Sequence, residues 1–224
     1  RDYKKANNTI DRALALNPTG LEPLEVKAKL AIAENGDFSV AEKAFDAVKS
    51  VAMSKEQKLK TTGSRIDVFL AERKYQEALQ LAESVRDDDL AAFIPHVWSK
   101  YFYIGLARRG LLDEDGARAA FLKAKASAEE QVKRTPDAED SHIQLAKTLA
   151  FLGERDAALA EAQRASAEVH AVLGNNDRAI EILEGLLTRP SGVTAQLLKV
   201  NPIWDPLRGD PHFQALIDKY GAKA

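Results

Sequence analysis

A pattern of small and large residues recurs six times along the 224-residue chain, with successive positions three, four and three residues apart. Each copy has an aromatic or polar residue, then Ala, then a large apolar residue or a second Ala, then a further small or apolar residue. These steps keep the four positions on one stripe of an α-helix. Ala lets a neighbouring helix approach closely, and the large residues fill the gap that remains. Because one helix cannot bury so narrow a stripe alone, the pattern predicts stacked helix pairs. The copies are Tyr3, Ala6, Ile10 and Ala13; Phe38, Ala41, Phe45 and Val48; Tyr75, Ala78, Ala82 and Val85; Glu114, Ala117, Phe121 and Ala124; Arg155, Ala158, Ala162 and Ala165; and Asn176, Ala179, Leu183 and Leu186.

The segments between the copies have the pattern expected of partner helices. Packing positions before the fourth and fifth copies are Tyr101, Ile104, Gly105 and Arg108, and His142, Leu145, Ala146 and Leu149. Glycines stand where the first helix of each pair should stop, as Gly commonly does at a helix C-terminus; they are Gly36, Gly110, Gly153 and Gly174. An Asp, Glu or Asn often follows, which suits the start of the next helix.

On these residues the chain resembles tetratricopeptide repeat proteins over essentially its whole length. The matched positions are Ala6, Ile10, Ala13 and Pro18; Ala41 and Phe45; Ala78; Gly105, Ala117, Phe121 and Ala124; and Ala158, Ala162 and Ala165. The resemblance implies an all-α fold, an α-solenoid of antiparallel helix pairs. We expect about five to six pairs over residues 1–200, with the first pair truncated.

The repeat length is irregular. The interval between equivalent alanines is 35 residues from Ala6 to Ala41, then 37, 39 and 41, and only 21 from Ala158 to Ala179. The family's period is about 34 residues. The short interval means either that one repeat is shortened or that a stretch near Ala165–Ala167 is missing. The good match on both sides favours a missing stretch.

The last part of the chain carries a separate signal. Asp210 followed by Pro211 is an N-cap with Pro at the first helical position. An apolar face on Phe213, Leu216, Ile217 and Tyr220 follows and predicts a short helix at about 211–220. Residues 201–224 are therefore expected to cap the exposed end of the array.

The stretch from Leu198 to Ile217 also resembles the end of the C-terminal repeat regions of bacterial signalling proteins, in which a serine/threonine kinase, nucleotide cyclase or winged-helix DNA-binding domain precedes the repeats. The resemblance is carried by Trp204-Asp205-Pro206-Leu207-Arg208 and Asp210-Pro211-His212-Phe213. It implies that the chain is the C-terminal region of a larger protein. A sequence that begins at Arg1, with its single Met at Met53, agrees with that expectation.

Composition and motifs argue against several other classes of function. The net charge is −2 and basic residues are dispersed, which disfavours nucleic-acid binding. There is no cysteine, no apolar run of about 20 residues, no phosphate-binding Gly-rich loop, no HExxH and no nucleophile elbow. Asp87-Asp88-Asp89 suits a solvated linker, with Asp89 as an N-cap. Four separated histidines, His96, His142, His170 and His212, are interpreted as surface or packed imidazoles. We expect no enzyme activity, metal or cofactor, no membrane contact from this fragment, and a cytoplasmic location unless a membrane span lies upstream.

A partner is expected on the concave face, which the first helix of each pair lines in such arrays. The candidate groove residues are Lys60, Asp67, Ser99, Phe102, Leu106, Arg109, Asp140 and Lys147. They mix both charges with two apolar residues, so no simple ligand charge follows. Phe102 has two interpretations: it packs on a neighbouring repeat, or it anchors a bound peptide. The Lys and Asn clamp that one subgroup of the family uses for chaperone tails is absent from its slots.

The sequence thus predicts a non-catalytic protein–protein interaction module that binds a protein, a peptide or a neighbouring domain of its own chain. The alternative is a structural scaffold for dimerisation or assembly, with the groove filled by the protein's own segments. A homodimer belongs to that alternative.

Overall fold

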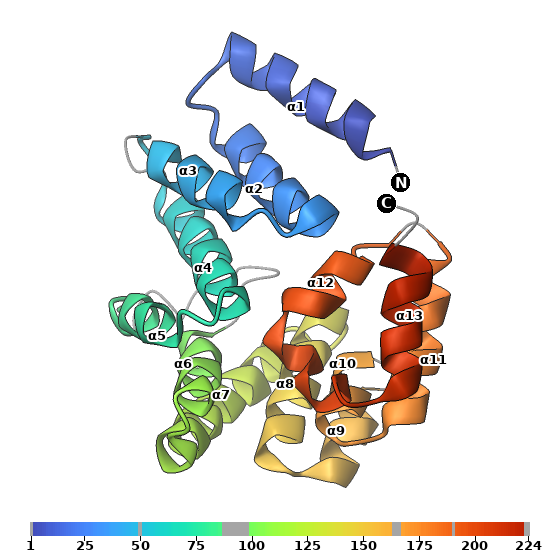
Figure 1. Ribbon diagram of the computed structural model, residues 1–224. Coiled ribbons are helices and arrows are strands. Elements are labelled where there is room, and N and C mark those ends of the chain that lie inside the picture. Colours follow the sequence, from blue (N-terminus) through green and yellow to red (C-terminus); the bar gives the residue numbers. More distant parts are fainter. Residues whose placement is uncertain (1, 49–50, 87–98, 163–166, 190, 222–224) are drawn as a thin grey trace.

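The computed structural model describes residues 2–48, 51–86, 99–162, 167–189 and 191–221. Within these ranges the chain forms helices and turns and no strand, so the all-α prediction is confirmed (Figure 1). The helices are α1 Tyr3–Leu16, α2 Leu21–Asn35, α3 Phe38–Val48, α4 Lys55–Ala71, α5 Tyr75–Glu83, α6 Lys100–Gly110, α7 Glu114–Arg134, α8 Glu139–Leu152, α9 Arg155–Glu161, α10 Ala167–Val172, α11 Asn176–Leu187, α12 Ala195–Val200, the 3₁₀ helix η2 Pro202–Leu207, and α13 Pro211–Gly221.

Consecutive helices pack against each other as pairs. We call α2, α4, α6, α8 and α10 the first helices and α3, α5, α7, α9 and α11 the second helices, because the latter carry the recurring alanines. The alanine that opens each second-helix stripe is buried, and Ala41, Ala78, Ala158 and Ala179 have no exposed surface. The large position is filled by buried Phe45, Phe121 and Leu183 where the sequence supplies a large residue. The stripe is therefore the packing surface between helices.

The turn inside each pair repeats with a fixed geometry. One residue with positive φ lies five positions before the stripe alanine in every described pair: Gly36, Arg73, Leu112, Gly153 and Gly174. The amide that follows it returns to a carbonyl near the helix end, as from Lys74 N to Phe69 O at 2.8 Å. This arrangement satisfies carbonyls that the helix leaves unpaired.

Gly110 is a correction to the predicted helix stops. Helix α6 runs through Gly110, and the left-handed residue is Leu112, with a φ of 63°. Gly110 is needed for a different reason, because a Cβ there would lie 2.4 Å from the ring of Tyr75. Arg73 is the other left-handed residue that is not Gly, and its φ is also 63°.

The interval of 21 residues is spanned by two short helices. Helix α9 has 7 residues and α10 has 6, and α10 packs against α8, α11 and η2. The predicted missing stretch falls largely on residues 163–166, which lie outside the described ranges, and Ala167 begins α10.

The C-terminal segment forms a body with the last pair. Helix α13 occupies Pro211–Gly221, where the sequence predicts a helix at about 211–220, and the Asp210 side chain accepts a hydrogen bond from the His212 amide at 2.9 Å. One apolar core joins α10 and α11 to this segment, through Ala167, Ala171, Ala179, Leu183, Leu198, Trp204, Leu207, Phe213, Leu216 and Ile217.

The chain also closes on itself, which the sequence analysis did not predict. Helix α12 packs against α2, so the C-terminal segment lies beside the N-terminal helices of the chain (Figure 1). Thr194 Oγ1 donates to the Ala33 carbonyl at 3.0 Å, across 161 residues. Arg73 makes a two-pronged ion pair with Asp205, at 2.6 and 2.7 Å. We call the resulting closed arrangement of helix pairs the ring.

Candidate functional site

Five first helices each contribute one polar side chain to a set of groups that interact electrostatically through Asp67. Asp67 of α4 lies at its centre and interacts with Lys29 of α2, Tyr103 of α6, Lys147 of α8 and Glu168 of α10. We call these five residues the inner charge cluster, and the surface on which they converge the inner face. Charges of both signs alternate around Asp67, so the cluster is close to neutral as a whole.

Asp67 has the most altered electrostatics in the cluster. Its side chain is reached by solvent, but surrounding protein atoms desolvate it, and this raises its pKa to about 7. Lys29, Lys147 and a hydrogen bond from the buried Tyr103 hydroxyl act in the opposite direction and favour the carboxylate. Near neutral pH the inner face therefore carries both protonation states of this carboxyl group.

Lys147 is the most deeply placed charge of the cluster. The residue is only 7% exposed, and its ammonium group forms an ion pair with Glu168. A buried ammonium needs such a partner because its desolvation is costly. The pair also ties α8 to α10, so it fixes the position of the short helix α10 on the inner face.

The structure brings two of the predicted groove residues, Asp67 and Lys147, into this cluster. Lys60 lies two helical turns before Asp67 on α4, is exposed, and pairs with Glu56 at 2.8 Å instead of with the cluster. Ser99 is the N-cap of α6, where its hydroxyl accepts from an amide of the same helix. Asp140 lies in the first turn of α8.

The burial and the ring contacts of Phe102 bear on its two interpretations. It is 3% exposed and meets the rings of Phe121 and Phe151 edge-on, each at 5.7 Å between centroids. It therefore packs against α7 and the neighbouring helix pair, as the first of the two interpretations expects. Leu106 is partly buried against the same group, and the exposed Arg109 lies over the Phe151 ring at 5.3 Å. Phe102 and Leu106 thus contribute to the core, and Arg109 covers the edge of this aromatic group.

Sequence reasoning missed Lys29, Tyr103 and Glu168. A signal for Glu168 exists: Asp67, Lys147 and Glu168 each lie six residues before the left-handed residue of their pair. In α6 that slot is Leu106, and Tyr103, one helical turn earlier, supplies the polar group. Extending the register of Asp67 and Lys147 to the last pair points to Glu168.

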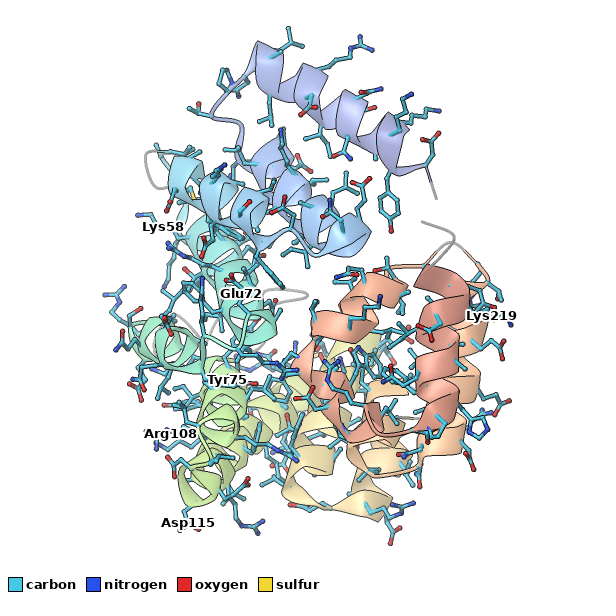
Figure 2. All side chains as sticks on the ribbon, in the orientation of Figure 1. Lys58, Glu72, Tyr75, Arg108, Asp115 and Lys219 are labelled. Atoms are coloured by element: carbon cyan, nitrogen blue, oxygen red, sulfur yellow. The ribbon has the colours of Figure 1, made fainter. Side chains whose placement is uncertain are left out.

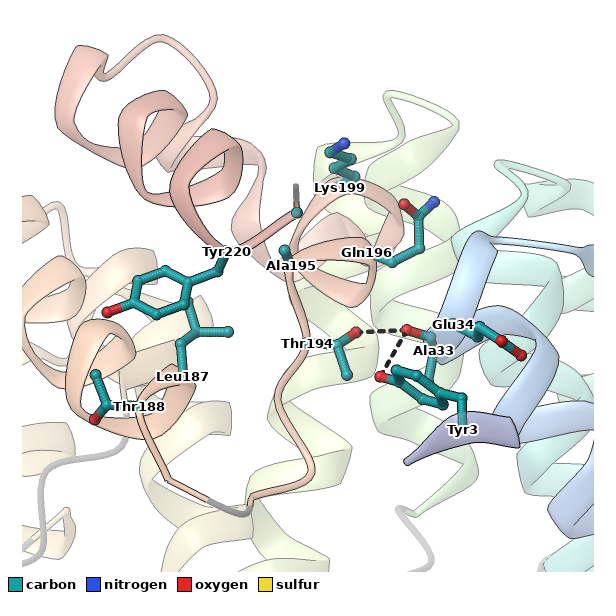
Figure 3. Close-up of a pocket in the computed structure, with 11 residues that line it drawn as sticks. Tyr3, Ala33, Glu34, Leu187, Thr188, Thr194, Ala195, Gln196, Lys199 and Tyr220 are labelled. Carbon is teal, nitrogen blue, oxygen red and sulfur yellow. Dashed lines mark hydrogen bonds between the residues drawn. The ribbon is translucent and has the colours of Figure 1, made fainter. Parts of the chain in front are cut away.

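A second concave feature lies where the ring closes. A cavity of about 440 Å³ separates α1 and α2 from the C-terminal segment (Figure 3). Its polar lining includes Tyr3, Glu34, Gln196 and Lys199. The Ala33 carbonyl at its edge accepts hydrogen bonds from both Tyr3 and Thr194, at 3.3 and 3.0 Å. The cavity belongs to the closed state, because its walls come from both ends of the chain.

The outer surface offers a smaller hollow of about 260 Å³ between α5, α6 and α7. Its basic residues include Arg108, which Figure 2 shows on the outside together with Lys58 and Lys219. Arg108 already pairs with Glu83 at 3.4 Å and with Asp113 at 3.2 Å. The hollow is thus less suited to binding than the inner face.

The described ranges were compared with the requirements of a metal site and of a membrane-spanning helix. No group of three potential metal ligands occurs there, and no helix there is long and apolar enough to cross a membrane. His142 lies between the Glu161 carboxylate at 2.6 Å and the Pro136 carbonyl at 2.8 Å, so it is a packed surface imidazole. His170 is partly buried and His212 is exposed, whereas His96 and the Asp87-Asp88-Asp89 run lie outside the described residues.

Comparisons with known proteins assign no family to the chain, so the functional proposal below is based on the geometry of the site. No protein-family model matches the chain, and a search of curated proteins finds no match either.

Proposed function

We propose that this chain is a non-catalytic protein-interaction module of the tetratricopeptide type, and that its inner face binds a segment of another protein or of a neighbouring domain. The inner charge cluster is the observation that carries the proposal. Five separate helices contribute to it, and its residues Lys29 and Asp67 are exposed to solvent. A cluster that only packed a core would not need exposed charges. Charged groups of both signs on a curved surface suit a peptide that presents complementary charges.

The resemblance of the stretch from Leu198 to Ile217 to the ends of bacterial signalling proteins places this module, in our proposal, at the C-terminal end of such a protein. Its role there would be regulatory, through binding of a partner or of the attached signalling domain. Both a cytoplasmic location and a location outside the cytoplasm are compatible with such an architecture.

The binding proposal is tested by capture from lysate of the source cells on immobilised protein, with quantitative mass spectrometry. Lys29→Glu and Asp67→Lys reverse exposed charges inside the cluster, and Lys60→Glu makes a matched reversal on the same helix as Asp67 but outside it. We expect proteins that the unmodified chain and Lys60→Glu retain but the two cluster variants lose. Identical capture profiles for all four proteins would contradict the assignment of the inner face.

A structural scaffold is the second candidate, and the closure of the ring is the observation that favours it. The C-terminal segment already occupies a surface of α2, as a self-filled groove would require. Light scattering over a hundredfold range of concentration separates the two functions. A dimer that persists at every concentration would favour the scaffold, and a monomer would favour the binding module.

A further inference from the structure

Residues 191–221, which contain α12, η2 and α13, fold back onto the N-terminal half of the chain. We propose that this segment, which we call the latch, opens and closes the ring and so controls how a partner reaches the inner charge cluster. The inference rests on the proposed function, because it assigns a regulatory device to the same inner face.

The latch has a core that does not depend on the ring being closed. Trp204, Leu207 and Phe213 are each at most 4% exposed, and they pack with the small and apolar residues of α10 and α11. Lys219 adds an ion pair to Glu184 of α11 at 2.7 Å. Because these contacts all lie within the C-terminal body, separating the latch from α2 leaves its fold intact.

The contacts that the described residues make to close the ring are more polar than those inside the C-terminal body. The side chains of the Arg73–Asp205 pair are 36% and 44% exposed, and such pairs contribute little and are weakened by salt. Thr194 donates to the Ala33 carbonyl, a bond that water can replace. Apolar contact comes from partly buried Leu197 and Val200 against the core of α2 and α3.

The closing surfaces also fit loosely. The cavity of about 440 Å³ lies between them, so atoms on its two sides make no contact with one another. A loose, polar and partly hydrated interface within one chain favours relative motion of the two bodies. Closed and open rings are therefore both populated, and a partner that binds the open ring more tightly shifts the population toward it.

The ring can be measured directly because the chain has no cysteine. Lys43→Cys on α3 and His212→Cys on α13 place two spin labels at exposed positions on the two bodies. Pulsed electron–electron double resonance then gives the distribution of distances between the two spin labels. We expect a dominant short distance for the closed ring and a minor longer distance for the open ring.

Arg73→Gln and Asp205→Asn each remove the ion pair that joins the latch to the turn between α4 and α5. Each variant should raise the ratio of open to closed ring by about threefold, and the double variant should raise it no further than the larger single effect. Potassium chloride at 1 M should move the unmodified ring in the same direction. Lys219→Gln, which breaks the ion pair inside the C-terminal body, should leave the distances unchanged.

Identical distance distributions in all of these proteins, with helix content preserved in circular dichroism, would overturn the latch. Mixing two singly labelled chains supplies another test, because a short distance between chains would show that the segment docks on a second copy instead. These measurements need no partner, so their failure is distinct from a failure of the binding proposal. If both hold, Arg73→Gln should retain the partners captured on the inner face in greater amount than the unmodified chain.

Discussion

Leu112 allows a quantitative test of the repeated turn geometry. Its φ is 63° and it is 86% exposed, so the side chain gains little from burial while the backbone stays left-handed. This conformation costs roughly 1 to 2 kcal/mol for a residue with a Cβ atom. Gly avoids that strain but gives the unfolded chain more freedom, which offsets about 0.4 to 1 kcal/mol. We expect Leu112→Gly to raise the free energy of unfolding by about 0.5 to 1 kcal/mol.

The converse change is available at the equivalent turn position of the next pair. Gly153 has a φ of 78°, and a Cβ placed on it would meet no atom within 4 Å. Gly153→Ala therefore adds backbone strain without a steric clash, and we expect it to lower the free energy of unfolding by about 0.5 to 1 kcal/mol. Leu112→Ala is the control, because it removes the exposed side chain but keeps the Cβ atom that causes the strain.

Urea unfolding at 25 °C, followed by far-ultraviolet circular dichroism, measures these differences when the slope with denaturant is the same for all variants. For a chain of this size each kcal/mol corresponds to a shift in Tm of roughly 2 to 4 °C. Equal stability of Leu112→Gly and Leu112→Ala would refute the reasoning, since the two differ at residue 112 only in the Cβ atom.

Three further predictions concern ionisable groups. Desolvation raises the pKa of Asp67 from 3.8 to about 7. The contribution of this group to stability is therefore complete below about pH 4 and is lost as the pH rises through 7. In parallel urea titrations, Asp67→Asn should increase the free energy of unfolding relative to the unmodified chain more at pH 8 than at pH 4. Glu168→Gln removes the ion-pair partner of the buried Lys147 ammonium and leaves Asp67 as its remaining neighbour of opposite charge; we expect a cost of about 1 to 3 kcal/mol in unfolding free energy, and the double change with Lys147→Met should restore most of it. His142 donates to the Glu161 carboxylate, which raises its pKa above 6.5; this contribution is present at pH 6 and disappears as the pH rises through the folded pKa, and an NMR titration should show a lower pKa for His142 in Glu161→Gln.

The helix pairs could be predicted because their information is local. Positions that repeat at steps of three and four report one helix face, and burial of Ala41, Ala78 and Ala158 follows from that face alone. The turn residue was predicted only where it is Gly. Leu112 has the same left-handed conformation as the glycines of the neighbouring pairs, although a leucine does not predict it. The packing of the two helices outweighs the backbone strain of about 1 to 2 kcal/mol.

The candidate site was predicted only in part, for a different reason. Phe102 has a position on α6 that a helix-based count directs to the groove, but the rings of Phe121 and Phe151 come from two other helices and enclose it. Periodicity along one helix carries no information on such neighbours. The Arg73–Asp205 pair joins residues 132 positions apart, and nothing in either local sequence specifies the other. Long-range electrostatic contacts of this kind become visible only in three dimensions.

Helix α10 connects the C-terminal segment to the rest of the closed ring. The space beside this short helix is taken by η2, which packs directly on α10 and buries Trp204 and Leu207 in the shared core. Because η2 lies there, Asp205 faces the turn between α4 and α5, where Arg73 reaches it. The packing of η2 on α10 therefore positions a residue that closes the ring, because Asp205 of η2 is the ion-pair partner of Arg73.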